Sequence, residues 1–317
     1  MKELISVIAP MYNEQSLVQE YCRRTLEVLR QIQGYRHEII LVNDGSNDGT
    51  YDEMLRVRAM NPNEIGIISL SRNFGLEGAV NAGLRLTQGD IVVVMDADLQ
   101  DPPELIPEML KKIVDGADIV TASRAHRKHD SLWKRFTAWV YYKTLDKLSG
   151  KLKLERNAAN FRMLTRTALT QLLELPESNK VFRVIVPYIG MKTASIEYDR
   201  DARFSGETKY NFAKMLRYAL DSLAGISIEP LTAALYTIPA AIFVLVIALL
   251  GFIFSSESLW QAAWTVIFFC SFLVVLVLTV ACLTGLYAGQ IILEAKHRPN
   301  SIIYEYIPAN SLQEAEE

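Results

Sequence analysis

Two aspartates separated by one residue, Asp96 and Asp98, follow an apolar run. The run Ile91–Met95 is typical of a buried β-strand, so both carboxylates are expected at a strand end. Carboxylates can bind Mg²⁺, which completes its shell with water and substrate phosphates. The sequence therefore suggests a cation site, and a solvated acidic turn is the alternative that a single Asp-x-Asp pattern leaves open.

A second polar cluster runs from Asp44 to Asp48, directly after the predicted strand Glu38–Asn43. Two interpretations stay open. In the first, Asp44 adds another acid to a binding site. In the second, the cluster is a Gly-containing turn in which Asp48 or Thr50 caps the next helix.

Short apolar runs alternate with amphipathic helices over residues 1 to about 225. The predicted strands are Leu4–Ala9, Glu38–Asn43, Ile65–Leu70, Ile91–Met95 and Asp118–Ala122. Helices are predicted over Glu14–Gln33, from Thr50, over Glu77–Leu86 and from Pro103. This order predicts an α/β fold whose mostly parallel sheet is covered on both faces. Ligands bind beyond the carboxyl ends of such strands, and polar clusters follow all of the predicted strands there.

Several common chemistries lack their residues. No Gly-x-Gly-x-x-Gly follows the first strand and no Gly-Lys-[Ser/Thr] loop occurs, which argues against dehydrogenases and P-loop NTPases. The histidines have no zinc-ligand spacing, and no nucleophile elbow is present. Three cysteines cannot build a disulfide framework, and a net charge of -3 argues against a nucleic-acid partner.

Two long uncharged runs dominate the C-terminal part. Membrane spans are predicted over Leu231–Phe254 and about Ala262–Tyr287, because a crossing helix needs roughly 20 mostly apolar residues. The link between them has no Lys or Arg, whereas basic residues flank the pair at Lys209, Lys214, Arg217, Lys296 and Arg298. The positive-inside rule then places both termini in the cytoplasm. A pair of buried core helices is the alternative.

The segments near 131–150 and 211–226 are predicted to lie on the membrane surface. Trp133 and Trp139 alternate with Lys134 and Arg135 in the first, a pattern typical of a helix on an anionic leaflet, with a core-packing helix as the alternative. The predicted organisation is therefore a cytoplasmic domain over 1–225, a two-helix membrane region over 231–293 and a cytoplasmic tail over 294–317.

An ordered set of motifs makes this pattern more specific. In chain order they are Pro10–Glu14, Val42–Thr50, Arg72–Gly75, Asp96–Glu104, Asn160–Leu164, Arg203–Tyr210 and, after both apolar runs, Lys296–Pro299. The set resembles family 2 glycosyltransferases with the Rossmann-like GT-A fold. Within that family it is similar to polyprenyl-phosphate glycosyltransferases of the dolichyl-phosphate mannose synthase, GtrB and ArnC type. The resemblance covers nearly the whole chain.

The resemblance implies roles for the matching positions. Nucleotide-sugar binding is expected from Pro10, Tyr12, Glu14, Asp44, Gln100, Arg203 and Lys209, with Asp44 accepting a hydrogen bond from the base. Asp96 and Asp98 are expected to be catalytic and to hold Mg²⁺ or Mn²⁺, with Asp98 as the more direct ligand. The acceptor phosphate is expected to meet Arg124, Arg127, Lys134 and Arg135. Solvated surface charge is the alternative for each of these basic residues.

Asn160, the third residue expected to be catalytic, departs from the family pattern. Relatives typically carry Asp there, a candidate base, and an amide cannot take up a proton. The acceptor is a phosphate monoester, which is largely dianionic at pH 7 because its second pKa is about 6. Asn160 is then expected to orient the acceptor phosphate or a sugar hydroxyl, with altered sugar choice or lost activity as the alternative. Leu286–Gln290 also lacks a Glu and an Arg that relatives carry.

The implied activity is transfer of one sugar to undecaprenyl or another polyprenyl phosphate by an inverting displacement. The donor is expected to be UDP-glucose or UDP-N-acetylglucosamine. The enzyme is expected in the plasma or inner membrane, as a homo-oligomer that relatives suggest is a tetramer. One alternative is a processive polysaccharide synthase, whose Gln-x-x-Arg-Trp motif is missing. The other is a catalytically silent scaffold that binds nucleotide sugar or lipid phosphate.

Overall fold

The computed structural model describes residues 2–124, 158–177, 181–199 and 259–310, with isolated positions between 239 and 250. The chain divides into two compact units. Unit 1 comprises Met1–Thr137, Lys153–Lys209 and Arg298–Glu317, and unit 2 comprises Ala138–Leu152 and Tyr210–His297. The predicted surface helices lie outside the described residues, and so does the predicted span Leu231–Phe254 apart from those isolated positions.

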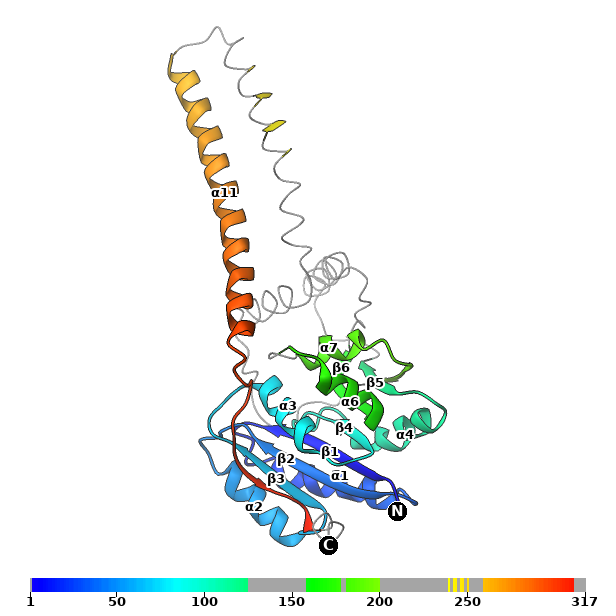
Figure 1. Cartoon of the computed structure of the whole chain (residues 1–317). Coiled ribbons are helices and arrows are strands. Elements are labelled where there is room, and N and C mark those ends of the chain that lie inside the picture. Colours follow the sequence, from blue (N-terminus) through cyan, green and yellow to red (C-terminus); the bar gives the residue numbers. More distant parts are fainter. Residues whose placement is uncertain are drawn as a thin grey trace. The chain divides into compact units, whose positions relative to one another are not determined.

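Eight described strands form one sheet in unit 1, in the order β7-β5-β6-β4-β1-β2-β3-β8 (Figure 1). They are β1 (Leu4–Met11), β2 (Arg36–Asn43), β3 (Ile65–Leu70), β4 (Ile91–Val94), β5 (Ile119–Arg124), β6 (Ala158–Thr165), β7 (Thr193–Tyr198) and β8 (Ile303–Ile307). Neighbours pair in parallel except that β6 is antiparallel to β4 and β5, and β8 is antiparallel to β3.

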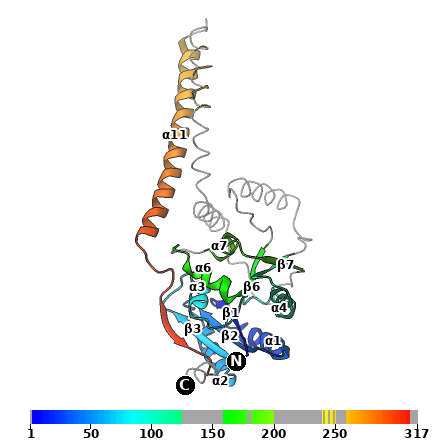
Figure 2. The ribbon, with the colours of Figure 1, turned by 45° about the vertical axis from the view of Figure 1, so that its right-hand side comes forward.

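Helices cover both faces of this sheet, as the turned view shows (Figure 2). The described helices of unit 1 are α1 (Val18–Gln31), α2 (Thr50–Met60), α3 (Leu76–Leu86), the 3-10 turn η1 (Pro103–Leu105), α4 (Ile106–Val114), α6 (Arg166–Glu174) and α7 (Phe182–Tyr188). Side chains of α1, α2 and α4 pack against one face, and those of α3, α6 and α7 against the other. Strands buried on both faces explain the continuous apolar runs.

The five predicted strands are confirmed, each within two residues at either end. The first helix begins at Val18 instead of Glu14. The main-chain N–H groups of Asn13, Glu14 and Gln15 donate to side chains of the β2–α2 loop, so these residues form a loop tied to that neighbour. Strands β6, β7 and β8 have no counterpart among the predicted elements.

The segment after the apolar helix returns to the sheet and supplies β8. The N–H of Ser71 donates to the carbonyl of Ile302 at 3.0 Å, and the Arg58 guanidinium donates to the carbonyl of Pro308 at 2.9 Å. Tyr51 also donates its hydroxyl proton to Glu305. Residues 302–308 are therefore an integral edge of unit 1.

Unit 2 contains one long described helix, α11 (Leu259–Ala295). Its part Thr265–Ala295 has a mean hydropathy of 3.0 over its most apolar window, none of it buried. Among the described residues this is the one helix long and apolar enough to cross a membrane. The predicted span Ala262–Tyr287 lies within α11.

A buried acid lies near the amino end of β2, away from the carboxyl ends of the strands. Glu38 is 1% exposed, and its Oε1 accepts a hydrogen bond from the Ser6 hydroxyl at 2.5 Å. Its Oε2 has no hydrogen-bond donor among the residues that the structure describes. Burial raises the pKa of Glu38, although the Ser6 hydrogen bond and the charges of Arg36 and Arg166 act against the rise. Ionised Glu38 therefore destabilises the fold.

Substitution of Gly45 tests how closely the loop after β2 packs against the loop after β3. Its φ is +62°, and an added Cβ would lie 2.4 Å from the Arg72 carbonyl carbon. We expect Gly45→Ala to lower the free energy of unfolding by about 2–4 kcal/mol in urea titrations. Gly116→Ala is the control, because Gly116 has φ +98° with nothing within 4 Å. Equal losses for both variants would contradict the close approach of the two loops.

Glu38→Gln tests the buried acid. The folded pKa lies above the unfolded value, so the protonated form is favoured in the fold and ionisation costs stability as the pH rises through the folded pKa. An uncharged amide avoids this cost, so the variant is expected to melt above the wild type at pH 8, with a gain that shrinks towards pH 4. Glu108→Gln, at an exposed position of α4, is the control. A gain independent of pH would contradict the assignment.

Candidate active site

The carboxyl ends of β1, β2, β3 and β4 meet at one edge because these strands run parallel. Each loop that follows contains one residue with positive φ: Asn13 (53°), Gly45 (62°), Gly75 (84°) and Leu99 (56°). This conformation costs an L-residue about 1–2 kcal/mol, so Asn13 and Leu99 are held there by their surroundings. The four sharp turns keep the polar motifs at the edge.

Asp44 joins two of these loops. It is 3% exposed, and its carboxylate oxygens accept hydrogen bonds from the N–H groups of Phe74 at 2.7 Å and Gly75 at 3.0 Å. Burial raises the pKa of Asp44, and these two hydrogen bonds partly offset the rise. The Arg72 guanidinium lies 4.2 Å from the centre of the Phe74 ring. The predicted contact of Asp44 with a nucleobase stays a prediction.

The β1–α1 and β2–α2 loops hold each other through side chains. Asn13 donates its N–H to Ser46 Oγ at 3.1 Å and accepts from the N–H of Asn47 at 2.8 Å. The N–H of Glu14 donates to Thr50 Oγ1 at 2.9 Å. Two of the residues expected to line the donor site, Tyr12 and Glu14, are half-buried there. A third, Pro10, is buried at the end of β1.

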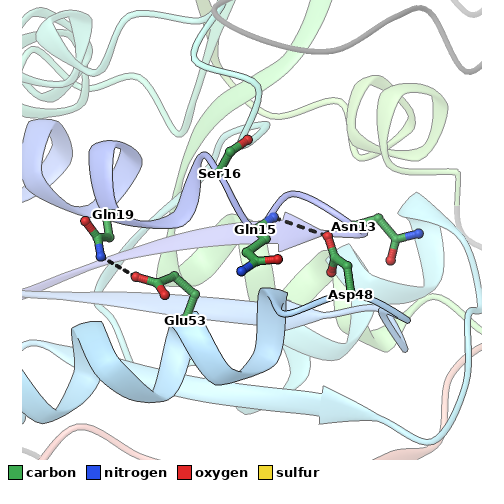
Figure 3. Close-up of a pocket in the computed structure, with 6 residues that line it drawn as sticks. All are labelled: Asn13, Gln15, Ser16, Gln19, Asp48 and Glu53. Carbon is green, nitrogen blue, oxygen red and sulfur yellow. Dashed lines mark hydrogen bonds between the residues drawn. The ribbon is translucent and has the colours of Figure 1, made fainter.

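A polar cavity of about 500 Å³ opens beside these loops (Figure 3). It is lined by Asn13, Gln15, Ser16, Gln19, Asp48 and Glu53. Gln19 donates to Glu53, and the N–H of Gln15 donates to Asp48 at 3.5 Å. Asp48 also accepts from the N–H of Thr50 at 3.0 Å, so the predicted Gly-containing turn is present. The N-cap of α2 is Gly49, without a side-chain capping hydrogen bond, so the predicted cap by Asp48 or Thr50 is wrong. None of the predicted metal ligands lines this cavity.

The Asp96–Asp98 turn lies at the same edge, after β4. Both aspartates are half-buried, and the N–H of Gln100 donates to Asp98 Oδ1 at 3.2 Å. Asn160 Nδ2 donates to Asp96 Oδ1 at 3.4 Å. Asp101 is buried and accepts a hydrogen bond from the Tyr198 hydroxyl of β7. The structure therefore brings Asp96, Asp98, Gln100 and Asn160 into one turn region.

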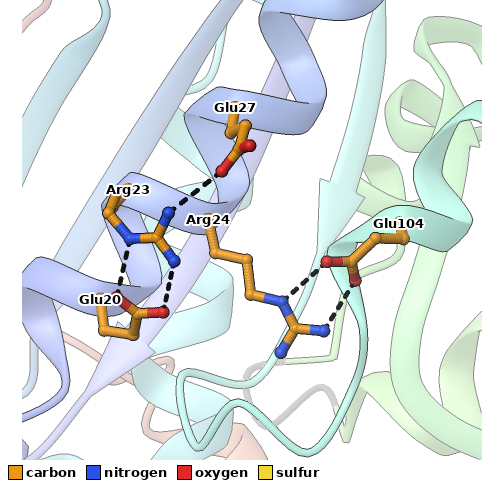
Figure 4. A network of polar contacts seen from close by, with 5 residues as sticks. All are labelled: Glu20, Arg23, Arg24, Glu27 and Glu104. Atoms are coloured by element: carbon orange, nitrogen blue, oxygen red, sulfur yellow. Dashed lines mark hydrogen bonds and ion pairs between the residues drawn. The ribbon is translucent and has the colours of Figure 1, made fainter.

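A polar network links the segment after this turn to α1 (Figure 4). Arg24 forms a two-pronged ion pair with Glu104 of η1, with N–O distances of 2.7 and 3.0 Å. Arg23 pairs with Glu20 and Glu27 along α1 itself. Exposed ion pairs contribute little stability, so this network adds little to the stability of the fold.

The basic residues expected at the site lie mostly outside the described chain. Arg127, Lys134, Arg135, Arg203 and Lys209 are all in the ranges that the structure does not describe. Arg124 is the last residue of β5, and only its main chain is described. Their roles therefore stay predictions.

Some groups of this edge were not singled out from the sequence. The N–H groups of Phe74 and Gly75 hold Asp44, and Tyr198 holds Asp101. The Arg72–Gly75 motif marks the loop that supplies the first pair, but the residue types do not indicate which main-chain N–H groups donate. Tyr198 is brought to the edge by the sheet topology, which gives no local signal.

Comparison with known proteins identifies the family of this chain. A model of glycosyl transferase family 2 matches residues 6–173. An uncharacterized glycosyltransferase of Bacillus subtilis is 36% identical over 94% of this chain and 92% of its own length. A prophage bactoprenol glucosyl transferase homolog of Escherichia coli is 34% identical over 94% and 98%. The bactoprenol glucosyl transferase of Shigella phage SfV is 34% identical over 94% and 97%.

These matches extend over most of this chain and most of each relative. They agree with the mostly parallel α/β sheet and with the order of motifs at its carboxyl edge. The chain therefore belongs to glycosyl transferase family 2 and is a glycosyltransferase with a GT-A-like fold.

Proposed function

We propose that this glycosyltransferase transfers one sugar from UDP-glucose or UDP-N-acetylglucosamine to undecaprenyl or a related polyprenyl phosphate. The observation that carries the proposal is the extent of the match to bactoprenol glucosyl transferases, which covers 94% of this chain and 97% or more of theirs. A match of that extent includes most of the apolar C-terminal part as well as the catalytic domain. The names of these relatives state that they are glucosyl transferases of bactoprenol, which is a polyprenol lipid.

A lipid acceptor fits the composition of unit 2. The helix α11 has the length and apolar composition of a membrane-spanning segment. An enzyme whose acceptor stays in the bilayer works best when its catalytic domain is held at the membrane surface. We place the catalytic domain and both termini in the cytoplasm, where nucleotide sugars are made, and we retain the homo-oligomeric state, a tetramer, as part of the proposal.

The acids at the sheet edge suit a divalent cation. Asp96 and Asp98, in the turn after β4, are the carboxylates that would hold the ion. Among the described residues no group of three or more His, Cys, Asp or Glu side chains is placed to bind a metal ion. Mg²⁺ is commonly bound by one or two carboxylates together with substrate phosphates, and Mn²⁺ accepts similar oxygen ligands. Bound there, the ion would neutralise charge on the leaving diphosphate.

The remaining chemistry belongs to the chain and the acceptor. The lipid phosphate is largely dianionic at pH 7, so its oxygen attacks the anomeric carbon without a protein base. The bond between that carbon and the nucleoside diphosphate breaks as the new bond forms, which inverts the anomeric configuration. The chain has to position both reactants, with Tyr12, Glu14 and Asp44 at the nucleoside and Gln100 near the diphosphate. Arg124 and the basic residues beyond it would bind the acceptor phosphate.

A lipid-product assay tests the proposal. The purified full chain is incubated with undecaprenyl phosphate, Mg²⁺ and each of several nucleotide sugars, and the lipid fraction is weighed by mass spectrometry. The expected product carries one hexose or one N-acetylhexosamine, and undecaprenol without phosphate gives none. A glycan that lengthens with time would favour the processive synthase. No product with any donor would contradict the proposal and favour a binding scaffold.

Asp98→Asn tests the carboxylate that is expected to be the more direct cation ligand. Loss of one charged contact at a transition state typically costs a hundredfold or more, so kcat is expected to fall by about 10²–10³. Asp115→Asn is the matched control, because Asp115 is exposed at the end of α4. Full activity of the Asp98 variant would remove this residue from the site.

A further inference from the structure

The pairing register of two strands places Asn160 opposite Asp96. β4 and β6 run antiparallel, with partners from Ile91 and Thr165 to Val94 and Arg162. β4 ends at Val94, and the same register continued two residues past that end would set Asp96 opposite Asn160. Side chains directly opposite on antiparallel strands have Cβ atoms about 4.5–5.5 Å apart, so they interact. The juxtaposition follows from main-chain pairing as well as from side-chain placement.

The two side chains are in hydrogen-bond contact. Asn160 Nδ2 donates to Asp96 Oδ1 at 3.4 Å. Asn160 is 3% exposed, whereas Asp96 is half-buried and borders the edge. A carboxamide can donate to a carboxylate and carries no charge itself. The contact therefore orients Asp96 without adding a negative charge beside it.

The strand that carries Asn160 is anchored on the same face. Arg162 is 1% exposed, and its guanidinium donates to the carbonyl of Phe182 at 3.1 Å. The N–H of Phe182 donates in turn to Glu77 Oε2 at 2.7 Å. This chain of contacts joins β6 to α7 and to the first turn of α3. Asn160 is thus presented to Asp96 from a fixed support.

We infer that Asn160 is a positioning residue that fixes Asp96 and limits the protein charges at the cation site itself to those of Asp96 and Asp98. This inference rests on the proposed function, because it takes Asp96 and Asp98 as the cation ligands. One divalent cation then balances the charges of the two carboxylates that would bind it, and Asn160 adds no further negative charge next to that cation. A third carboxylate at position 160 would hold the cation more tightly and would repel the diphosphate.

The experiment measures binding with Mn²⁺ and UDP on the purified full chain. Free Mn²⁺ is counted by electron paramagnetic resonance without nucleotide, and UDP affinity is measured at saturating Mn²⁺ by equilibrium dialysis. Asn160→Asp is expected to bind Mn²⁺ about tenfold more tightly and UDP about tenfold more weakly. Asn160→Ala is expected to bind Mn²⁺ about tenfold more weakly, at the lower end of the effect of removing a group that orients a ligand.

Asn61→Asp is the control, because Asn61 follows α2 and its amide caps that helix by donating to the Val57 carbonyl. It adds the same charge and is expected to change neither affinity. Weakening of both affinities in Asn160→Asp, or no change in either, would overturn the inference, and so would faster turnover with unchanged binding. Neither measurement uses lipid, so a wrong acceptor leaves the inference intact. Absence of Mn²⁺ binding in the wild type would overturn it together with the proposed cation site.

Discussion

A carboxylate that leaves bulk water needs hydrogen-bond donors, and the carboxyl edge of this sheet supplies them from its own loops. Asp44 accepts hydrogen bonds from the N–H groups of Phe74 and Gly75. Asp98 accepts one from the N–H of Gln100, among other contacts, and Asp96 accepts one from the side-chain amide of Asn160. These contacts orient the acids before any ligand arrives. The turns with positive φ and the helix contacts around them keep the donors in place. Because the edge is preorganised, little conformational entropy is lost when it binds a charged ligand.

Much of the fold could be predicted because β1 to β5 are buried, apolar and separated by helices. The later strands could not. β6 carries the buried polar residues Asn160 and Arg162, which break the apolar pattern, and β8 is a short edge strand that follows an apolar helix. α1 begins at Val18, later than predicted, because the preceding residues donate hydrogen bonds to another loop instead of extending the helix. Local periodicity has no access to such long-range pairing.

The meeting of the polar loops at one edge could also be predicted from the sequence, since parallel strands bring their following loops together. The internal contacts of the site could not. Asn160 contacts Asp96 because β6 lies antiparallel between β4 and β5. The residues of β6 follow Asp96 by more than 60 positions in the sequence, so the local sequence around Asp96 does not indicate the contact. The amide expected to face the acceptor contacts a carboxylate in this structure. Main-chain donors such as the N–H groups of Phe74 and Gly75 have no signature in residue type.

In the proposed function, the two acids after β4 hold the cation that accompanies the nucleoside diphosphate. The most direct measurement is a structure of the full chain in a lipid nanodisc with Mg²⁺ and UDP. The cation is expected within about 2.1 Å of a carboxylate oxygen of Asp98, with the diphosphate bound to the same ion and the base beside Asp44. A cation whose ligands include neither Asp96 nor Asp98, or a nucleotide bound away from this edge, would contradict it.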